Sequence, residues 1–430
     1  MKLFIKNILW INPGDSEHNN TLSFRIGDGI LLEFGPHIIE NQAEEVIDGN
    51  GYCCSPGWID LICRAGAPGN PQNESIETLA NAAAAGGFTK IMLQPDTRPI
   101  IQSIESVSYY KNLKPKNGIE FLVSAASTQN LEGKKMAEML RLSKAGASSF
   151  SLTQSMADSG FFGRILQYLQ HCGKVLIDQP SDQFLAKGGQ INEGNVSERR
   201  GLAGIPIEAE EIIVDRDISI LKYVGGKLHL SCLSSAQSVL KTALAKSEGH
   251  SVSSSISANQ LAFTDENLDQ FDTVHKVLPP YRSEEKRQEL IKVLKDGKVD
   301  AVTSNHTPLH YDFKDIEFEN ADFGISALET TFSALVHYGE ISNPEAIVNL
   351  LHIGPSKIIG LEREELKKGI KTSFTLFSTR KTTKFETQNW QSKSKNNPFI
   401  GTELSGLVLG IVTEYGFALN PHTKSIPESK

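Results

Sequence analysis

The middle of the chain, residues 56 to about 360, repeats one local pattern: a short apolar run next to a longer amphipathic segment. Repeated strand–helix units of this kind form parallel sheets. So many units within about 300 residues favour a closed barrel. The sequence therefore predicts an α/β protein with a (β/α)8 TIM-type barrel. Clear examples of the apolar runs are KIMLQP (90–95), FLVSAA (121–126) and KLHLSCL (227–233).

The two ends of the chain have a different pattern, with short alternating or β-branched runs that are separated by Gly-containing turns. Because chain termini often lie close together, we expect both ends to pair in one small β-sandwich domain. The predicted boundaries are 1–55 plus 362–430 for this accessory domain and 56–361 for the barrel. The polar segment 381–397 is predicted to be a loop near the β-domain.

Charge and composition exclude several classes of protein. Lys plus Arg is 43 and Asp plus Glu is 51, so the formal charge of −8 argues against nucleic-acid binding, which needs a basic face. No apolar run approaches the ~20 residues that cross a bilayer, and the N-terminus lacks a signal-peptide core. The five cysteines are odd in number and have no Cys-x-x-Cys spacing. We expect free thiols in a cytoplasmic protein with no membrane contact.

Several motifs resemble those of one enzyme family. The chain is similar to dihydroorotases and the related hydantoinase-type amidohydrolases, with the matches in order along the predicted barrel. They are PGWIDL (56–61) with Pro68-Gly69, PDTRP (95–99), GNVSERRGLAGIPIEAEEIIVDRDI (194–218), KVLPPYR (276–282), NHTP (305–308), FGISALET (323–330) and GPSKIIGL (354–361).

The resemblance implies a particular chemistry. Dihydroorotases cyclise carbamoyl aspartate to dihydroorotate, reversibly, in pyrimidine synthesis, and zinc ions activate water and polarise the ring amide. The metal ligands in active relatives are a His-x-His on the first strand, a bridging carboxylated Lys or Asp, two further His and a final Asp that is also the general base. Two side chains at i and i+2 share one face of a strand, so both reach one ion.

The chain departs from this pattern at almost every ligand position. Ile62 and Arg64 replace the His-x-His, and Arg64 carries a permanent positive charge where a cation is expected. The substrate clamps have changed too, with Gly66 in place of an Arg. The degenerate pocket is expected to contain Ile62, Arg64, Asp96, Thr153 (after Leu152), Asp178, Cys232, Asn259, Leu278, Asn305 and His306.

The residues that remain do not suffice for a zinc site. Asp178 and Cys232 are possible ligands, but two ligands do not make the three or four that zinc needs. We therefore expect no metal and no other cofactor, and no catalytic residue, since Asn305 replaces the general-base Asp. Arg64 is predicted to pair with Asp178 and fill the vacated metal space, because a buried unpaired Arg is costly.

Two other histidines have structural interpretations. His229 is expected to pack or hydrogen-bond within a barrel strand. His310 lies one residue beyond the expected site, so a register shift is one way for it to reach the pocket.

Three functions remain open at this point. The first is a non-catalytic dihydroorotase-like protein, because some relatives without metal ligands serve as assembly partners of aspartate carbamoyltransferase. The second is an active dihydroorotase or other cyclic-amide hydrolase with a rebuilt site that uses residues such as Asp96 and His306. The third is a ligand-binding regulator that uses the same cavity. A homo-oligomer is expected in each case.

Overall fold

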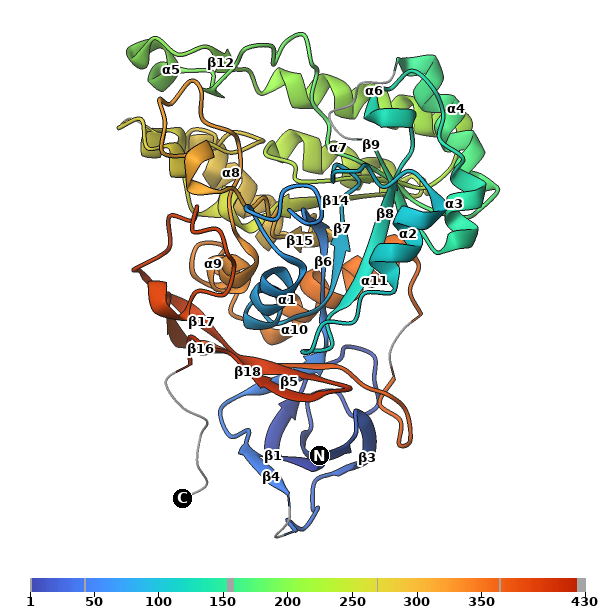
Figure 1. Ribbon diagram of the computed structural model, residues 1–430, viewed down its shortest axis with the longest axis vertical. Helices are drawn as coiled ribbons and strands as arrows, with labels where there is room; N and C mark the ends of the chain where they lie inside the picture. Colours follow the sequence, from blue (N-terminus) through green and yellow to red (C-terminus); the bar gives the residue numbers. More distant parts are fainter. Residues whose placement is uncertain (1, 42–43, 153–157, 269, 363–364, 424–430) are drawn as a thin grey trace.

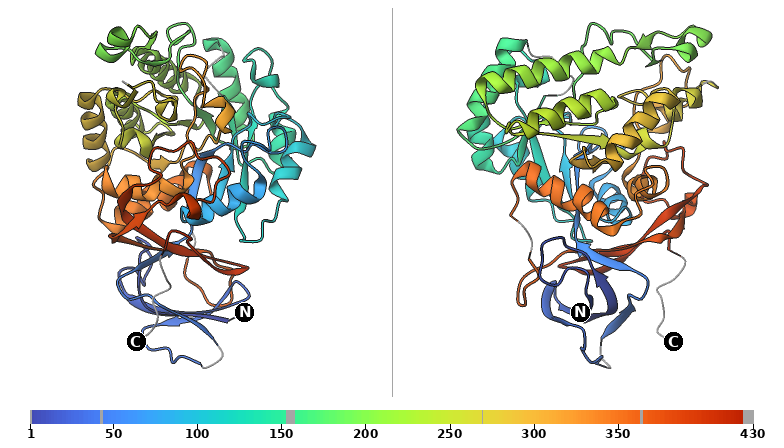
Figure 2. Two further views of the ribbon diagram at one scale, coloured as in Figure 1. Left: turned by 60° about the vertical axis from the view of Figure 1, so that its left-hand side comes forward. Right: turned by 180° about the vertical axis from the view of Figure 1, so that it is seen from behind.

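The computed structural model describes residues 2–41, 44–152, 158–268, 270–362 and 365–423. It has two parts (Figure 1): a barrel surrounded by helices, and below it a β-sandwich that contains the N-terminus. The strands β16–β18 near the C-terminus cross between the two parts, which is visible from all three directions of view (Figures 1 and 2). Both ends of the chain thus meet at the same side of the barrel.

Eight parallel strands form the barrel, and each pairs with the next one along the chain. The first and last strands also meet, since Cys63 and His306 form a parallel bridge and the Arg64 amide donates to the His306 carbonyl at 2.9 Å. The predicted fold class is confirmed. The strands are β6 (Trp58–Cys63), β7 (Phe88–Leu93), β8 (Glu120–Ala126), β9 (Ser149–Leu152), β10 (Leu176–Asp178), β13 (Leu228–Leu230), β14 (Val252–Ser257) and β15 (Ala301–Thr303).

A buried carboxylate strengthens this closure. Asp60 on β6 accepts hydrogen bonds from the Thr303 hydroxyl at 2.6 Å, the Ser304 amide at 2.8 Å and the Ser304 hydroxyl at 2.6 Å. Burial raises the pKa of Asp60, and these hydrogen bonds oppose that shift. Asp60 therefore joins the first strand to the last and does not face the barrel mouth.

The barrel interior is filled by apolar side chains, including Ile59, Leu61, Met92 and Ile177. Helices cover the outside, and several begin at a Ser or Asp whose side chain caps the first turn, as Ser75, Asp158 and Ser283 do. The helices are α1 (Ile76–Ala85), α2 (Ile104–Lys111), α3 (Met139–Ala145), α4 (Ser159–Gln170), α5 (Asn195–Arg200), α6 (Glu208–Val224), α7 (Ala236–Ser247), α8 (Glu284–Lys295), α9 (Thr331–His337), α10 (Pro344–Val348) and α11 (Gly354–Ile359).

One excursion interrupts the alternation. Between β10 and α6 the chain forms the short parallel pair β11 (Ile191–Asn192) and β12 (Gly204–Ile205) with α5 between them. This excursion lies at the end of the barrel away from the sandwich (Figure 1). Parallel barrel strands place their carboxyl ends at one face, so the excursion borders the face where sites form in such barrels.

The sandwich sheet runs in the order β18-β17-β16-β5-β1-β2-β3, with β4 beside β1. The antiparallel pair of β16 and β5 joins the two ends of the chain, as the sequence predicts. The boundaries at 55/56 and 361/362 stay a prediction. The strands are β1 (Lys2–Trp10), β2 (Thr21–Gly27), β3 (Ile30–Gly35), β4 (Glu45–Asp48), β5 (Cys53–Pro56), β16 (Phe374–Lys384), β17 (Glu403–Thr413) and β18 (Gly416–Leu419).

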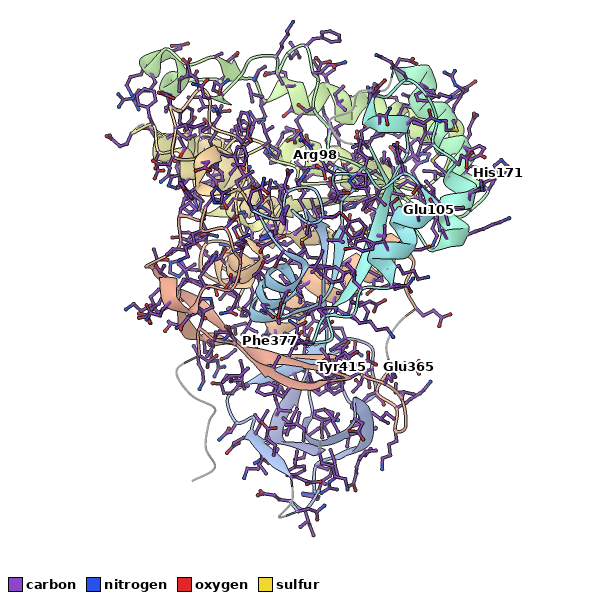
Figure 3. The ribbon with its side chains drawn as sticks, viewed as in Figure 1. Arg98, Glu105, His171, Glu365, Phe377 and Tyr415 are labelled. Atoms are coloured by element: carbon purple, nitrogen blue, oxygen red, sulfur yellow. The ribbon has the colours of Figure 1, made fainter. Side chains whose placement is uncertain are left out.

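An aromatic cluster fixes the sandwich against the barrel. Trp58 at the start of β6 contacts Phe88, Phe332 and Phe377, with ring centroids 4.9–6.4 Å apart. Phe377 belongs to β16 and lies where the sheet meets the barrel (Figure 3). Buried aromatic rings prefer defined orientations in addition to burying apolar area, so these contacts fix how the sheet packs on the barrel.

The prediction for residues 381–397 is partly wrong. Residues 381–384 extend β16, and residues 391–397 bind the loops around the barrel instead of the β-domain. Glu329, which is buried, accepts hydrogen bonds from the amides of Gln391 and Ser392 and from the His422 ring at 2.8 Å. These charge-assisted bonds hold the polar segment against the barrel loops.

Two further contacts place this segment beside the barrel mouth. Glu74, in the loop after β6, is buried and accepts from the Ser392 hydroxyl and the Lys393 amide. Asn396 accepts from the Leu309 amide at 3.3 Å and donates to the Thr307 carbonyl at 3.3 Å. The segment therefore holds the loops that follow the first and last barrel strands.

Two further predictions concern free thiols and membrane-spanning helices. All five cysteines are free, as predicted. Among the described residues, no helix is long and apolar enough to cross a membrane.

We expect Glu329→Ala to lower the free energy of unfolding by about 3 kcal/mol, because it leaves buried amides and the His422 ring without their acceptor. Chemical denaturation measures the change. Glu345→Ala is the matched control, since Glu345 forms a more exposed pair with His18 at 2.9 Å. Its effect should stay within about 1 kcal/mol. Equal losses in the two variants would show that Glu329 does not hold the segment.

Candidate functional site

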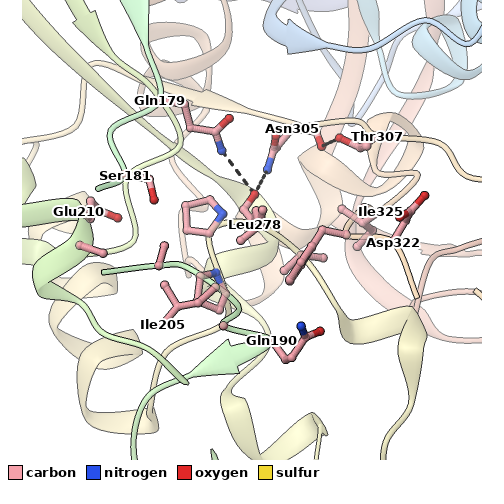
Figure 4. Close-up of a pocket in the computed structure, with 18 of the residues that line it drawn as sticks. Gln179, Ser181, Gln190, Ile205, Glu210, Leu278, Asn305, Thr307, Asp322 and Ile325 are labelled. Carbon is pink, nitrogen blue, oxygen red and sulfur yellow. Dashed lines mark hydrogen bonds between the residues drawn. The ribbon is translucent and has the colours of Figure 1, made fainter. Parts of the chain in front are cut away.

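A cavity of about 630 Å³ opens at the carboxyl ends of the barrel strands. Its walls come from the loops after β6, β7, β10 and β15, from the start of α6, and from residues 277–282. In Figure 4, Asn305, Gln179 and Thr307 lie on one side of this cavity, and Ile205 and Gln190 lie on the other. Its size and position are those of a small-molecule site.

The guanidinium of Arg64 dominates the first side. Its Nε donates to the Asp96 carboxylate at 2.7 Å, and its Nη1 donates to Asn305 Oδ1 and to the Thr307 hydroxyl, each at 3.2 Å. Its Nη2 donates to Gln179 Oε1 at 3.4 Å. All three nitrogens therefore have protein partners, and one of these partners is a carboxylate.

Electrostatics keep this side chain charged. Burial by itself lowers the pKa of Arg64, but the adjacent Asp96 carboxylate outweighs burial and the pKa is raised. The Arg64 side chain is 22% exposed and that of Asp96 is 29% exposed, so water screens the pair only in part. The predicted pair between Arg64 and Asp178 is wrong, because Asp96 is the carboxylate that Arg64 contacts.

Strand alternation explains the error. Ile177 faces the barrel interior, so Asp178 points outward toward α6 and is buried there. Burial, together with the neighbouring Asp178 carboxyl, raises the pKa of Asp217 on α6 well above its usual range. The next residue, Gln179, is the one that reaches the cavity. The side chain that faces the cavity is therefore that of the residue after the expected one.

The backbone carbonyl of Leu278 accepts hydrogen bonds from the side-chain amides of Asn305 and Gln179. Asn305 Nδ2 donates to it at 2.8 Å and Gln179 Nε2 at 3.4 Å (Figure 4). Asn305 has φ 51°, a left-handed conformation that Asn tolerates better than most residues. Both ends of its amide are thus occupied, one by Arg64 and the other by Leu278.

The structure brings only part of the expected pocket together. Arg64, Asp96, Leu278 and Asn305 line the cavity. Ile62 and Cys232 instead belong to the apolar barrel interior, where burial raises the pKa of the Cys232 thiol. Asn259 is buried and donates to the Ser304 carbonyl at 3.4 Å. Thr153 lies outside the described residues.

His306 also turns away from the cavity. Its Nδ1 accepts from the Ala327 amide at 3.1 Å, which leaves the proton on Nε2. This Nε2 lies 3.6 Å from the Glu74 carboxylate, and both side chains are fully buried. The position expected in the pocket is therefore occupied by a structural histidine.

The two remaining histidines are structural as well. His310 lies outside the cavity lining and contacts the Asp312 carboxylate at 3.1 Å, so no register shift brings it into the site. His229 hydrogen-bonds the hydroxyls of Ser253 and Ser255 at 2.9 and 3.0 Å, which confirms its predicted role. Burial lowers the pKa of His229 to about 4, so it is neutral at physiological pH.

The side chains at the mouth do not fit the zinc site of active relatives. Within the described ranges, no three His, Cys, Asp or Glu residues come close enough together to hold an ion. A guanidinium stands where the second ligand of the first strand is expected, and zinc requires three or four N, S or O ligands. We therefore derive no step through a metal.

Comparison with known proteins decides the family. A family model described as "Dihydro-orotase-like" matches residues 51–238. The dihydroorotase of Carboxydothermus hydrogenoformans is 34% identical over 415 residues, which are 94% of this chain and 95% of that protein. The dihydroorotase of Caldanaerobacter subterraneus subsp. tengcongensis is 33% identical over 420 residues, 96% of each chain. The chain belongs to the dihydroorotase family.

Solved structures of hydantoinases share the fold of this dihydroorotase-family chain. The L-hydantoinase (dihydropyrimidinase) from Arthrobacter aurescens has a TM-score of 0.84 and 21% identity, and the alignment covers 98% of this chain and 96% of that one. The dihydropyrimidinase from Brevibacillus agri has a TM-score of 0.81 and 19% identity, with the same coverage. These structures support the barrel-plus-sandwich architecture.

Sequence reasoning missed several cavity residues. Gln179 directly follows β10, so strand alternation reveals it, whereas Thr307 is part of the 305–308 motif but reaches the cavity through the loop after β15. Gln190 and Glu210 come from the excursion after β10 and the start of α6. The motif at 194–218 includes Glu210, but the motif alone gives no direction for the side chain.

We expect Arg64→Gln to lower the free energy of unfolding by about 1–2 kcal/mol, because Asp96 loses its charged partner at a half-screened site. Thermal or urea unfolding measures the loss. The control is Arg141→Gln, which removes a well-exposed pair with Glu138 and should change stability by less than about 0.5 kcal/mol. A gain in stability on replacing Arg64 would contradict the pairing described above.

Proposed function

We propose that this chain is a non-catalytic dihydroorotase homologue of pyrimidine biosynthesis. In this proposal it acts as an assembly partner of aspartate carbamoyltransferase, is cytoplasmic and homo-oligomeric, and has no metal of its own. Membership of the dihydroorotase family supports a role in pyrimidine biosynthesis. The assembly role is supported by the resemblance to family members that lack the ligands and serve as such partners.

One observation carries the loss of catalysis. Arg64 occupies the end of the first strand and is held there by Asp96, Asn305, Thr307 and Gln179. Metal-dependent amide hydrolysis needs an ion that activates water and polarises the carbonyl. A fixed guanidinium in that place repels a cation.

A general base for proton transfer is also missing at position 305. Asn305 has no acidic proton and no basic oxygen, and both ends of its amide are engaged. The groups that a rebuilt hydrolase would need are mostly elsewhere, because Asp178, Cys232 and His306 lie outside the cavity lining. Of the groups named for a rebuilt hydrolase, Asp96 lines the cavity, and its carboxylate is bound by Arg64. This arrangement argues against the alternative of a rebuilt hydrolase.

Turnover assays with added zinc test the catalytic part. Full-length protein is compared with the dihydroorotase of Carboxydothermus hydrogenoformans, with dihydroorotate in one direction and carbamoyl aspartate in the other. We expect turnover by the relative and none by this chain at equal concentration. Zinc-dependent turnover that Asp96→Asn abolishes would instead establish the rebuilt enzyme.

Size-exclusion chromatography with the host's aspartate carbamoyltransferase tests the assembly part. We expect the mixture to elute ahead of either protein alone, with both chains in the early peak. Independent elution at micromolar concentrations of both proteins would contradict the assembly role without restoring catalysis.

A further inference from the structure

A second arginine, Arg282, lines the same cavity, and its bonding partners differ from those of Arg64. Its side chain is 3% exposed, and three bonds fix it. The Nε donates to the Ser234 hydroxyl at 3.0 Å, and Nη1 donates to Asn192 Oδ1 and to the Ile205 carbonyl, each at 2.9 Å. The third nitrogen, Nη2, makes no hydrogen bond with a described residue.

No carboxylate contacts this guanidinium directly among the described residues. Ser234 separates it from Glu210, and Asn192 separates it from Asp265, since each of these neutral side chains bonds both neighbours. Burial lowers the pKa of Arg282, while these acids oppose that shift. An Arg side chain stays protonated under such conditions, so a positioned charge remains.

The other charged groups of the cavity are already satisfied. Arg64 gives all three nitrogens to protein partners and is neutralised by Asp96. Glu210 accepts from the amide and hydroxyl of Ser234 and from the Ser235 amide. Asp322, the third carboxylate of the lining, lies near Lys276 and Lys314, where burial lowers the lysine pKa values and the Asp322 charge opposes that shift.

Gln190 adds a second unsatisfied group on the Arg282 side. It lines the cavity, and its Oε1 is buried and has no hydrogen-bond partner in the part of the chain that the structure describes. Its Nε2 donates only to the Gly188 carbonyl, at 3.3 Å. Figure 4 shows Gln190 on the side of the cavity opposite Asn305 and Gln179. The unsatisfied groups are thus separated from the Arg64 cluster.

We propose that the Arg282 side of the cavity binds the oxyanion group of a small molecule, a carboxylate or a phosphate, with Nη2 of Arg282 as the donor. A fixed guanidinium binds such groups with little reorganisation, and the cavity has the volume of small-molecule sites. The Gln190 amide contacts a neighbouring polar group of the ligand.

This site goes beyond the proposed function, because it is a binding site whether or not the chain is catalytic. It also differs from the substrate clamps that the family resemblance implies. Those clamps are at positions 66, 96 and 278, near Arg64. The Arg282 site is formed by Gln190 after β10 and by the Ser234 and Asn192 neighbours of Arg282.

Isothermal titration of the full-length protein tests the proposal. Inorganic phosphate and succinate are the two probes, and sodium chloride holds the ionic strength constant. We expect saturable binding of one or both probes beyond that of chloride. Phosphate alone would identify a phosphate ligand, succinate alone a carboxylate, and both the shared oxyanion chemistry. Binding of neither probe would overturn the proposal.

A substitution that adds a negative charge to the cavity wall tests whether the probes bind on the Arg282 side. Gln190→Glu keeps the side-chain shape and adds a carboxylate to the cavity wall, two residues from the Asn192 that holds Arg282, so we expect the dissociation constant to rise about tenfold or more. Gln167→Glu makes the same change on the exposed face of α4 and should leave binding within about twofold. Equal affinities of the Gln190→Glu and Gln167→Glu variants would overturn the location at Arg282.

Discussion

The ion pair between Arg64 and Asp96 determines what the barrel mouth can do. A guanidinium cannot lose its charge in a protein, so it needs acceptors wherever it is placed. Asp96, Asn305, Thr307 and Gln179 supply them from three different loops. The same bonds remove these side chains from any other chemistry. One interaction thus organises this side of the site, and it places a fixed positive charge at the end of the first barrel strand.

The surrounding scaffold makes this arrangement rigid. Asp60 joins the first and last strands, and buried Glu74 and Glu329 hold residues 391–397 across the loops at the mouth. These carboxylates are bonded to backbone amides and hydroxyls in the structure, which gives them structural roles. The polar contacts that hold the barrel closed and its loops in place are therefore separate from the contacts that Arg64 makes in the cavity.

Much of the fold could be predicted from the sequence because it follows from local periodicity. Alternating strand and helix patterns, and β-rich ends, specify a barrel and a sandwich independently of side-chain detail. Site geometry does not follow in this way. Asp178 and Gln179 are adjacent, yet strand alternation sends one toward α6 and the other into the cavity. A motif therefore marks the end of the strand without showing which of its side chains faces the cavity.

Partners across the fold were equally hard to predict. Arg64 pairs with Asp96 rather than Asp178, and His306 turns toward Glu74, because loop conformations after the strands decide both contacts. The polar pattern of 381–397 predicts a loop near the β-domain, but the buried acceptors Glu329 and Glu74 hold residues 391–397 against the barrel loops. Arg282 lies in the motif at 276–282. Which of its nitrogens stays without a partner in the described part of the chain depends on Ser234, Asn192 and Ile205, which are far away in the sequence.

Zinc content tests the central claim most directly. The full-length chain and the dihydroorotase of Carboxydothermus hydrogenoformans are dialysed together against one zinc-containing buffer and then analysed for bound metal. The account predicts that this chain retains no zinc above a metal-free protein standard while the relative retains its own. Stoichiometric zinc in this chain that is lost when Asp96 or Asp178 is replaced by Ala would contradict it.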